Sequence, residues 1–418
     1  MASKDECIAI NPYAVPKKRK KIIGLDELVS DFYKEQSKNM IELSGEEETS
    51  EWGIQLFRDQ KSPPSPCPVE DCGLLKSFMN SELNSLVELS LENGDSFIEG
   101  LLVGGWLTKL VLTYGGHVEE SIAVWTYNLV LYSTKENLRT SACDFWSAIL
   151  SLKKEPIKID WFPNYSELRK ALEVYGFLLS NIGAADAKSS CGGPSQNIRS
   201  WIKFVTAACQ FRSKWSIFST SEAEELVEVV ICFFLDRQLQ GLSVLLYECA
   251  QAVIGYFTDE EWNASCEKIA KSLACRVPKD MNCIRVVECI SGIDDRSKQL
   301  RSAVAFEILI GFFDKKVTSC ALALHFQLAA HPDDILRLLI GINLKDKKCD
   351  LYKMYMYLIL TQNWLLSKNL LEDNGVLKEM YSLYLRNCSC QISSTDLRTF
   401  ASKVRDKASF LLQGATKI

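Results

Sequence analysis

The chain has 418 residues, of which 47% are hydrophobic and 24% charged, and its formal net charge is −5. This composition is typical of a soluble globular protein with a large core. It excludes a membrane-spanning protein, because no stretch reaches the roughly 20 apolar residues that a transmembrane helix needs. The N-terminus also lacks the cationic start and apolar stretch of a secretory signal, so we expect an intracellular protein.

The first candidate feature along the chain is a basic run of five adjacent residues, Lys17, Lys18, Arg19, Lys20 and Lys21. Five cations in a flexible tail present an extended positive strip, which the acidic groove of an importin can bind. The alternative is a solvated charge run or a phosphate contact. We interpret the run as a nuclear localisation signal, with importin as the partner and the nucleus as the location.

An apolar stripe follows the basic run. On a helix, one face would carry four apolar residues, Leu25, Leu28, Val29 and Phe32, and another face the acids between them. Such a helix either docks on the protein's own body or inserts into the groove of a partner. The residues alone leave both alternatives open.

The clearest boundary is the proline-rich stretch 61–68, which holds four prolines in six residues. Proline continues neither a helix nor a central strand. We therefore predict a disordered tail over residues 1–72 and a folded body over 73–418. Ser62 and Ser65 each precede a proline and are candidate sites for proline-directed phosphorylation, which would add negative charge. A plain proline-rich linker is the alternative.

From residue 73 onward, apolar residues recur at three- and four-residue spacing, and period-two alternation is scarce. Several predicted helices begin with a capping pair, in which an acid follows a Ser, Thr or Asn by three residues. The pairs are Ser96 with Glu99, Asn164 with Glu167, Ser221 with Glu224, and Thr258 with Glu261. We predict an all-α fold with helices over 73–92, 96–114, 117–132, 136–151, 164–181, 196–212, 221–236, 239–256, 259–274, 280–291, 295–313, 316–329, 332–341, 350–366, 371–387 and 395–413.

Helices joined by short turns are typical of an irregular stack of helix pairs, as in HEAT and armadillo proteins. No fixed-period repeat supports one repeat family, and an irregular helical globule is the alternative. The longest internal break, 182–195, is a long loop or a seam between two halves. Gly104 and Gly105 are expected to permit close packing within one helix, and Gly116 to lie at a helix end.

No catalytic, cofactor or metal site is predicted. The 16 cysteines are spread singly through apolar segments, which is typical of free thiols in a reducing compartment, and none has zinc-knuckle spacing with a histidine nearby. The three histidines, His117, His325 and His331, lie outside any recognised catalytic motif. Paired carboxylates fall at predicted helix starts, where the helix dipole favours them. We therefore expect a protein that is not an enzyme.

The charge distribution bears on the partners. The five tail cations contribute +5 to a total of −5, so the rest of the chain carries −10. An acidic body repels phosphates, which disfavours direct nucleic-acid binding by the folded part. Aromatic segments around Trp161 and Tyr355 are either core or interface anchors. We expect a nuclear scaffold that binds a helical protein partner, and a transcription or chromatin regulator of helical-repeat type is the alternative.

The layout as a whole, a basic tail from Asn11 to Lys21 ahead of an all-helical body without a catalytic motif, resembles the CANIN-type proteins. Their helical domain binds the coiled-coil SMC subunit and the non-SMC partner of the SMC five/six DNA-repair complex. The resemblance covers residues 73–418 and carries no family site onto individual residues. It implies a chromosome-associated adaptor in DNA damage repair and genome stability, with a non-SMC element-type subunit or the SMC coiled coil as partner.

Overall fold

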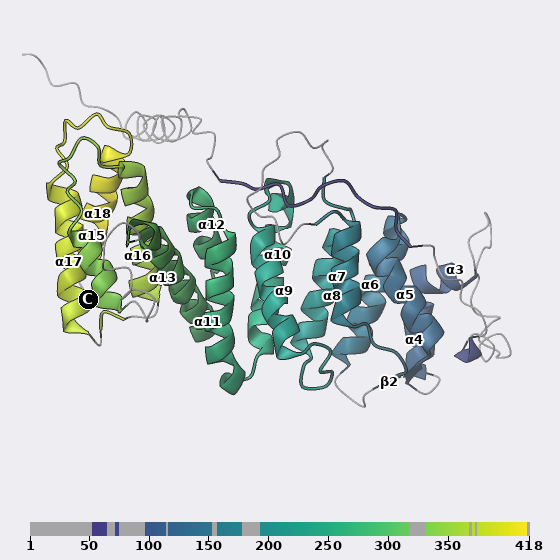
Figure 1. Cartoon of the computed structure of the whole chain (residues 1–418). Coiled ribbons are helices and arrows are strands. Elements are labelled where there is room, and N and C mark those ends of the chain that lie inside the picture. The colour runs from purple at the N-terminus through teal and green to yellow at the C-terminus, as the bar shows by residue number, and fades with distance from the viewer. Residues whose placement is uncertain are drawn as a thin grey trace, which may run out of the picture. The chain divides into compact units, whose positions relative to one another are not determined.

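The computed structural model describes residues 52–64, 72–74, 97–113, 116–152, 157–177, 193–317, 331–367, 370–372 and 374–415 (Figure 1). Internal contacts divide the chain into two units, Met1–Ser50 and Glu51–Ile418, and every described residue belongs to the second unit. The predicted nuclear localisation signal and the predicted helix around Leu28 therefore lie outside the described residues.

The described part of the chain is almost wholly helical, so the all-α prediction is confirmed. Its helices are α3 (Phe97–Val103), α4 (Trp106–Thr113), α5 (Glu120–Tyr132), α6 (Glu136–Ser151), α7 (Tyr165–Val174), α8 (Ile198–Gln210), α9 (Thr220–Phe233), η2 (Arg237–Leu242), α10 (Ser243–Tyr256), α11 (Asp259–Arg276), α12 (Met281–Cys289), α13 (Asp295–Val317), α15 (Pro332–Ile340), α16 (Leu351–Ser367), α17 (Gly375–Cys390) and α18 (Ala401–Ala415). A two-residue parallel pair, β1 (His117–Val118) with β2 (Lys158–Ile159), replaces the predicted helix start at residue 117.

The helices form a stack in which elements close in sequence pack on one another (Figure 1). Successive contacts join α5 with α6, α6 with α8, α8 with α10, α9 with α11, α11 with α13 and α13 with α16, and α17 packs on α15 and α18. One hydrophobic core runs through these helices, from Leu56 to Leu411. Helix α8, which follows the break at 182–195, packs on α5 and α6, which precede it.

Side-chain caps account for several helix starts. Thr258 and Glu261 form the predicted capping box of α11, and Asn164 accepts from the Glu167 amide at the start of α7. The prediction for α9 is wrong by two residues, because the capping box is Ser219 with Glu222. The predicted helix 96–114 is also wrong, since Gly105 adopts φ +71° and separates α3 from α4. A left-handed residue ends a helix, and glycine adopts that conformation at little cost.

Residues 52–64, here called the strap, correct the predicted extent of the tail. The strap is extended and lies against the helices, and two of its side chains are fully buried, Leu56 at 1% and Phe57 at 0% exposed. Its amides donate to carbonyls at helix ends, from Ile54 to Leu235 (2.8 Å) and from Lys61 to Val174 (2.8 Å). Helix C-termini leave such carbonyls without intrahelical partners, so an extended segment can satisfy them.

Two further contacts fix the course of the strap. The Leu56 amide donates to the buried Asp236 carboxylate at 3.0 Å, and the Arg58 amide to the Gly176 carbonyl at 3.0 Å. Gly176 has φ +83°, and a Cβ there would lie 2.5 Å from the Arg58 oxygen. Only glycine therefore permits this close approach of the strap to the end of α7.

No single helix in the described part of the chain is long and apolar enough to cross a membrane. One pair bent by 106°, Thr220–Phe233 with Arg237–Tyr256, meets the criterion only when the two helices are taken together.

Candidate functional site

Among the predicted site residues, only Ser62 lies in the described part of the chain. Its side chain is exposed near the end of the strap. The next two residues, Pro63 and Pro64, line a recess of about 310 Å³ together with three side chains of α5, Trp125, Leu129 and Tyr132. The phosphorylation prediction for Ser62 and Ser65 stays a prediction, and Ser65 lies outside the described residues.

The two described histidines contact single carboxylates. His117 Nε2 lies 2.6 Å from Asp160, and hydrogen bonds from Lys158 and His117 lower the pKa of Asp160. His331 is the N-cap residue of α15, with its Nδ1 3.7 Å from Asp333. The described residues contain no cluster of three potential metal ligands, and His325 lies outside them.

The aromatic segments around Trp161 and Tyr355 pack against the core. The ring of Trp161 lies 5.6 Å from that of Tyr127, and Tyr355 packs on Phe400 at 5.5 Å. Tyr357 in the same helix is 3% exposed. These rings therefore stabilise the helical stack, and we do not assign them to a protein-binding surface.

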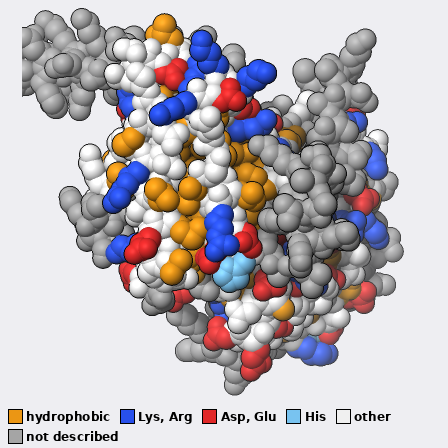
Figure 2. Space-filling view, turned by 60° about the vertical axis from the view of Figure 1, so that its left-hand side comes forward, with side chains coloured by type: hydrophobic (Ala, Val, Ile, Leu, Met, Phe, Trp, Pro, Cys, Tyr) orange, Lys and Arg blue, Asp and Glu red, His pale blue; other side chains and the backbone are white. Residues whose placement is uncertain are grey.

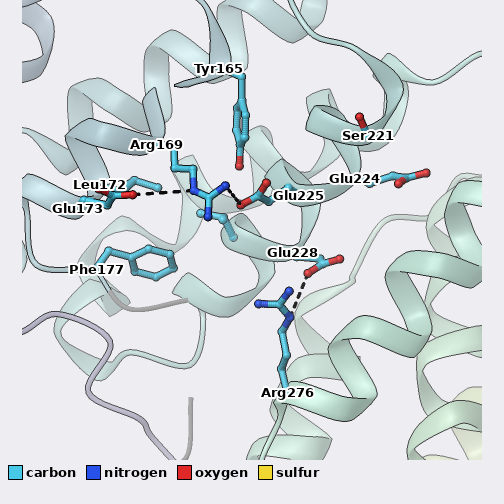
Figure 3. Close-up of a pocket in the computed structure, with 11 residues that line it drawn as sticks. Tyr165, Arg169, Leu172, Glu173, Phe177, Ser221, Glu224, Glu225, Glu228 and Arg276 are labelled. Carbon is cyan, nitrogen blue, oxygen red and sulfur yellow. Dashed lines mark ion pairs between the residues drawn. The ribbon is translucent and has the colours of Figure 1, made fainter. Parts of the chain in front are cut away.

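A cleft of about 590 Å³ lies between α7, α9 and the end of α11 (Figure 3). We call it the α7–α9 cleft. Its lining combines four glutamates and two arginines with apolar and aromatic side chains, and consists of Tyr165, Arg169, Leu172, Glu173, Phe177, Ser221, Glu224, Glu225, Glu228, Val229 and Arg276. Four carboxylates against two guanidiniums leave the lining with a negative balance.

On the α11 side of the cleft, the carboxylates join two helices. Glu224 accepts from Ser265 and Lys268, both at 2.8 Å. Glu228 accepts from Ser272 at 2.7 Å and pairs with Arg276 at 3.3 Å. Burial raises the pKa of Glu228, and the hydrogen bond from Ser272 and the positive charge of Arg276 oppose that effect. These two glutamates therefore hold α9 against α11.

On the α7 side, the carboxylate of Glu225 has a looser cationic partner. Arg169 Nη1 lies 3.6 Å from Glu225, and Arg169 Nε lies 4.0 Å from Glu173. Figure 3 shows the guanidinium of Arg169 between these two carboxylates. The Arg169 side chain is 57% exposed, whereas that of Glu225 is 26% exposed. Burial, together with the Glu225 carboxylate, raises the pKa of the Tyr165 hydroxyl above its usual value.

The sequence contains a signal for this cleft in three closely spaced glutamates of α9. Glu224, Glu225 and Glu228 lie within five residues of one helix, but Glu224 was assigned to a capping pair with Ser221. Because Ser219 and Glu222 form the actual cap, Glu224 is available to α11. The basic partners come from distant helices, so the spacing within α9 could not identify them.

A second surface feature is an apolar stripe on α17. Val376 is 59% and Leu383 is 47% exposed, and half-buried Met380 lies between them. Their spacing of four and three residues places them on one face of the helix. Phe410 of the adjacent α18 is 67% exposed. Figure 2 turns the side of α15, α17 and α18 forward and shows hydrophobic side chains gathered there among charged ones.

Comparison with known proteins adds no family. No protein-family model matches the chain, and no curated protein matches it. The structure itself defines the class as an all-α helical stack, and the α7–α9 cleft and the α17 stripe are its candidate functional surfaces.

Proposed function

We propose that this chain is a nuclear scaffold that acts by binding other proteins and not by catalysis. The supporting observation is the α17 stripe, Val376, Met380 and Leu383. In the described part of the chain, α17 packs chiefly on α15 and α18. A helix at the end of a stack normally turns a polar face to solvent, because no further helix covers it. Clustered apolar side chains on such a face are typical of an interface with another protein.

The geometry of the stripe favours a helical partner. Seven residues of a helix extend about 10 Å along its axis, so the stripe offers about two turns of apolar ridge. A partner helix or coiled coil can pack its own ridge against such a surface. In line with the resemblance to CANIN-type proteins, we propose that the partner is a subunit of the SMC five/six complex. The proposed process is DNA damage repair.

The test is affinity purification of the tagged full-length chain from nuclei, followed by mass spectrometry. The variant V376E/L383E places two carboxylates on the stripe. The matched control V244E/I293E makes the same chemical change at two other exposed apolar positions, 70% and 88% exposed. We expect SMC five/six subunits with the wild type and the control, and at least a tenfold loss with V376E/L383E.

Two results would contradict the proposal in different ways. Equal recovery with both variants would show that α17 is not the docking surface. The lack of SMC five/six subunits from a wild-type purification would refute membership of that complex. Enrichment of transcription or chromatin factors instead would favour the alternative function.

A further inference from the structure

We infer that the α7–α9 cleft is a second binding site, which receives an arginine side chain from an extended or helical segment of a partner protein. Glu225 is the carboxylate that binds the guanidinium. This inference goes beyond the proposed function, because it concerns different helices and a different chemistry from the α17 stripe. It also stands if the partner at α17 is not an SMC five/six subunit.

The size and walls of the cleft suit an arginine. A volume of about 590 Å³ lies within the usual range of ligand sites, roughly 300–1,000 Å³. Leu172 and Phe177 supply apolar surface, against which the aliphatic stem of an arginine can pack. Tyr165 and Phe177, each 7% exposed, also border the cleft. The cleft therefore combines a charged floor with a hydrophobic wall.

The charges favour a cationic ligand over an anionic one. The lining has four glutamates and two arginines, and each arginine already faces at least one carboxylate. A phosphate group entering the cleft would meet this negative balance, which disfavours nucleic acid as the occupant. An arginine would lower the net negative charge of the lining.

Glu225 differs from Glu224 and Glu228 in the length of its contact with a cationic side chain. Glu224 and Glu228 accept hydrogen bonds of 2.7–2.8 Å from residues of α11. Glu225 has Arg169 at 3.6 Å, with the Arg169 side chain 57% exposed, and it shares a hydrogen bond with the Tyr165 hydroxyl. An exposed ion pair contributes little to stability, so a ligand guanidinium can displace Arg169 at a small cost. A guanidinium can also donate two parallel hydrogen bonds to one carboxylate, which lysine cannot do.

The experiment measures fluorescence anisotropy with the full-length chain and a labelled probe peptide. The probe is a 16-residue alanine- and leucine-based helix with two arginines four residues apart. Matched peptides carry lysine or citrulline, the neutral isostere of arginine, at the same two positions. We expect the arginine peptide to bind at least tenfold more tightly than the citrulline peptide and severalfold more tightly than the lysine peptide.

Two substitutions should act in opposite directions. E225Q removes the receiving charge and should weaken binding of the arginine peptide at least tenfold. R169Q removes the competing guanidinium and should strengthen it severalfold. The control E260Q makes the same charge change at an exposed residue at the other end of α11, and it should leave the affinity unchanged. Because Glu225 and Arg169 are partly exposed, we expect thermal unfolding of both variants to match the wild type.

Equal affinity for the arginine and citrulline peptides would overturn the inference. An equal loss in E225Q and E260Q would also overturn it, since that result indicates a general electrostatic attraction. A loss in R169Q would show that Arg169 belongs to the binding surface and does not compete with the ligand. The variant V376E/L383E should bind the probe as the wild type does, so this result and the test of the α17 stripe can fail independently.

Discussion

Phe57 should be the anchor that holds the strap on the helices. Its side chain is 0% exposed, and its ring lies 5.6 Å from Phe177 and 5.8 Å from Phe233. Replacing a buried phenylalanine with alanine costs about 3–5 kcal/mol, which includes the lost transfer free energy and the cavity. The strap is not itself part of a helix, and its hydrogen bonds go to the ends of helices much later in the chain. The strap can therefore detach while those helices stay packed on one another, which avoids part of the cost of the cavity. F57A should therefore open the strap and leave the helices folded.

Amide hydrogen exchange of the full-length chain measures this opening. The amides of Ile54, Leu56 and Arg58 donate to the body in the wild type and should be protected. A loss of about 3–5 kcal/mol should speed their exchange by roughly two to four orders of magnitude. The control K61A shortens an exposed side chain of the same strap and should change little. Unchanged exchange in F57A would refute the anchoring role, and simultaneous exposure of α8 and α9 would refute local opening.

Three other predictions concern charge. Glu261 accepts hydrogen bonds from the Arg212 guanidinium (2.6 and 2.9 Å), the Thr220 hydroxyl and the Thr258 amide, which hold its pKa well below the usual value of 4.5. The ionised carboxylate therefore stabilises the fold above about pH 4.5, and this contribution to the free energy of unfolding is lost as the pH falls below that value. E261Q should lower the free energy of unfolding in urea by about 1.5–3 kcal/mol at pH 7 and by less at pH 3, and an equal decrease at both pH values would contradict this. Changing residues 17–21 to glutamine should shift a fluorescent fusion from the nucleus to the cytoplasm, and unchanged nuclear accumulation would exclude this run as the signal. The same variant should show little duplex DNA binding in anisotropy titrations at about 150 mM salt, where submicromolar binding would refute the protein-scaffold proposal.

The helices could be predicted from the sequence because their determinants are local. Both ends of α6 agree with the predicted range 136–151, and the capping box of Thr258 was identified from a spacing of three residues. Apolar periodicity and caps depend on residues within a turn or two of each other. The error at Gly105 has the same origin, since sequence alone does not show whether a glycine continues a helix or takes a positive φ.

The strap and the cleft could not be predicted, because their determinants are distant in the chain. Leu56 and Asp236, which are 180 residues apart, share a buried hydrogen bond. In the sequence, residues 52–57 are a short apolar run between an acidic and a proline-rich stretch, which is typical of a tail. Only the structure shows the helix ends on which this run packs. Arg169 likewise meets Glu225 only because residues of α7 and α9 line the same cleft.

The arrangement of glutamates on α9 explains how one helix can serve both packing and binding. Glu224 and Glu228 are four residues apart, so they lie on the same face, and both bond to residues of α11. Glu225 follows Glu224 by one residue, which turns its side chain by about 100° around the helix, and it faces Arg169 of α7 instead. The two carboxylates that hold the helices together thus lie one and three positions along α9 from the carboxylate of Glu225. Charge at position 225 can therefore be changed for binding with little effect on the packing of α9 against α11.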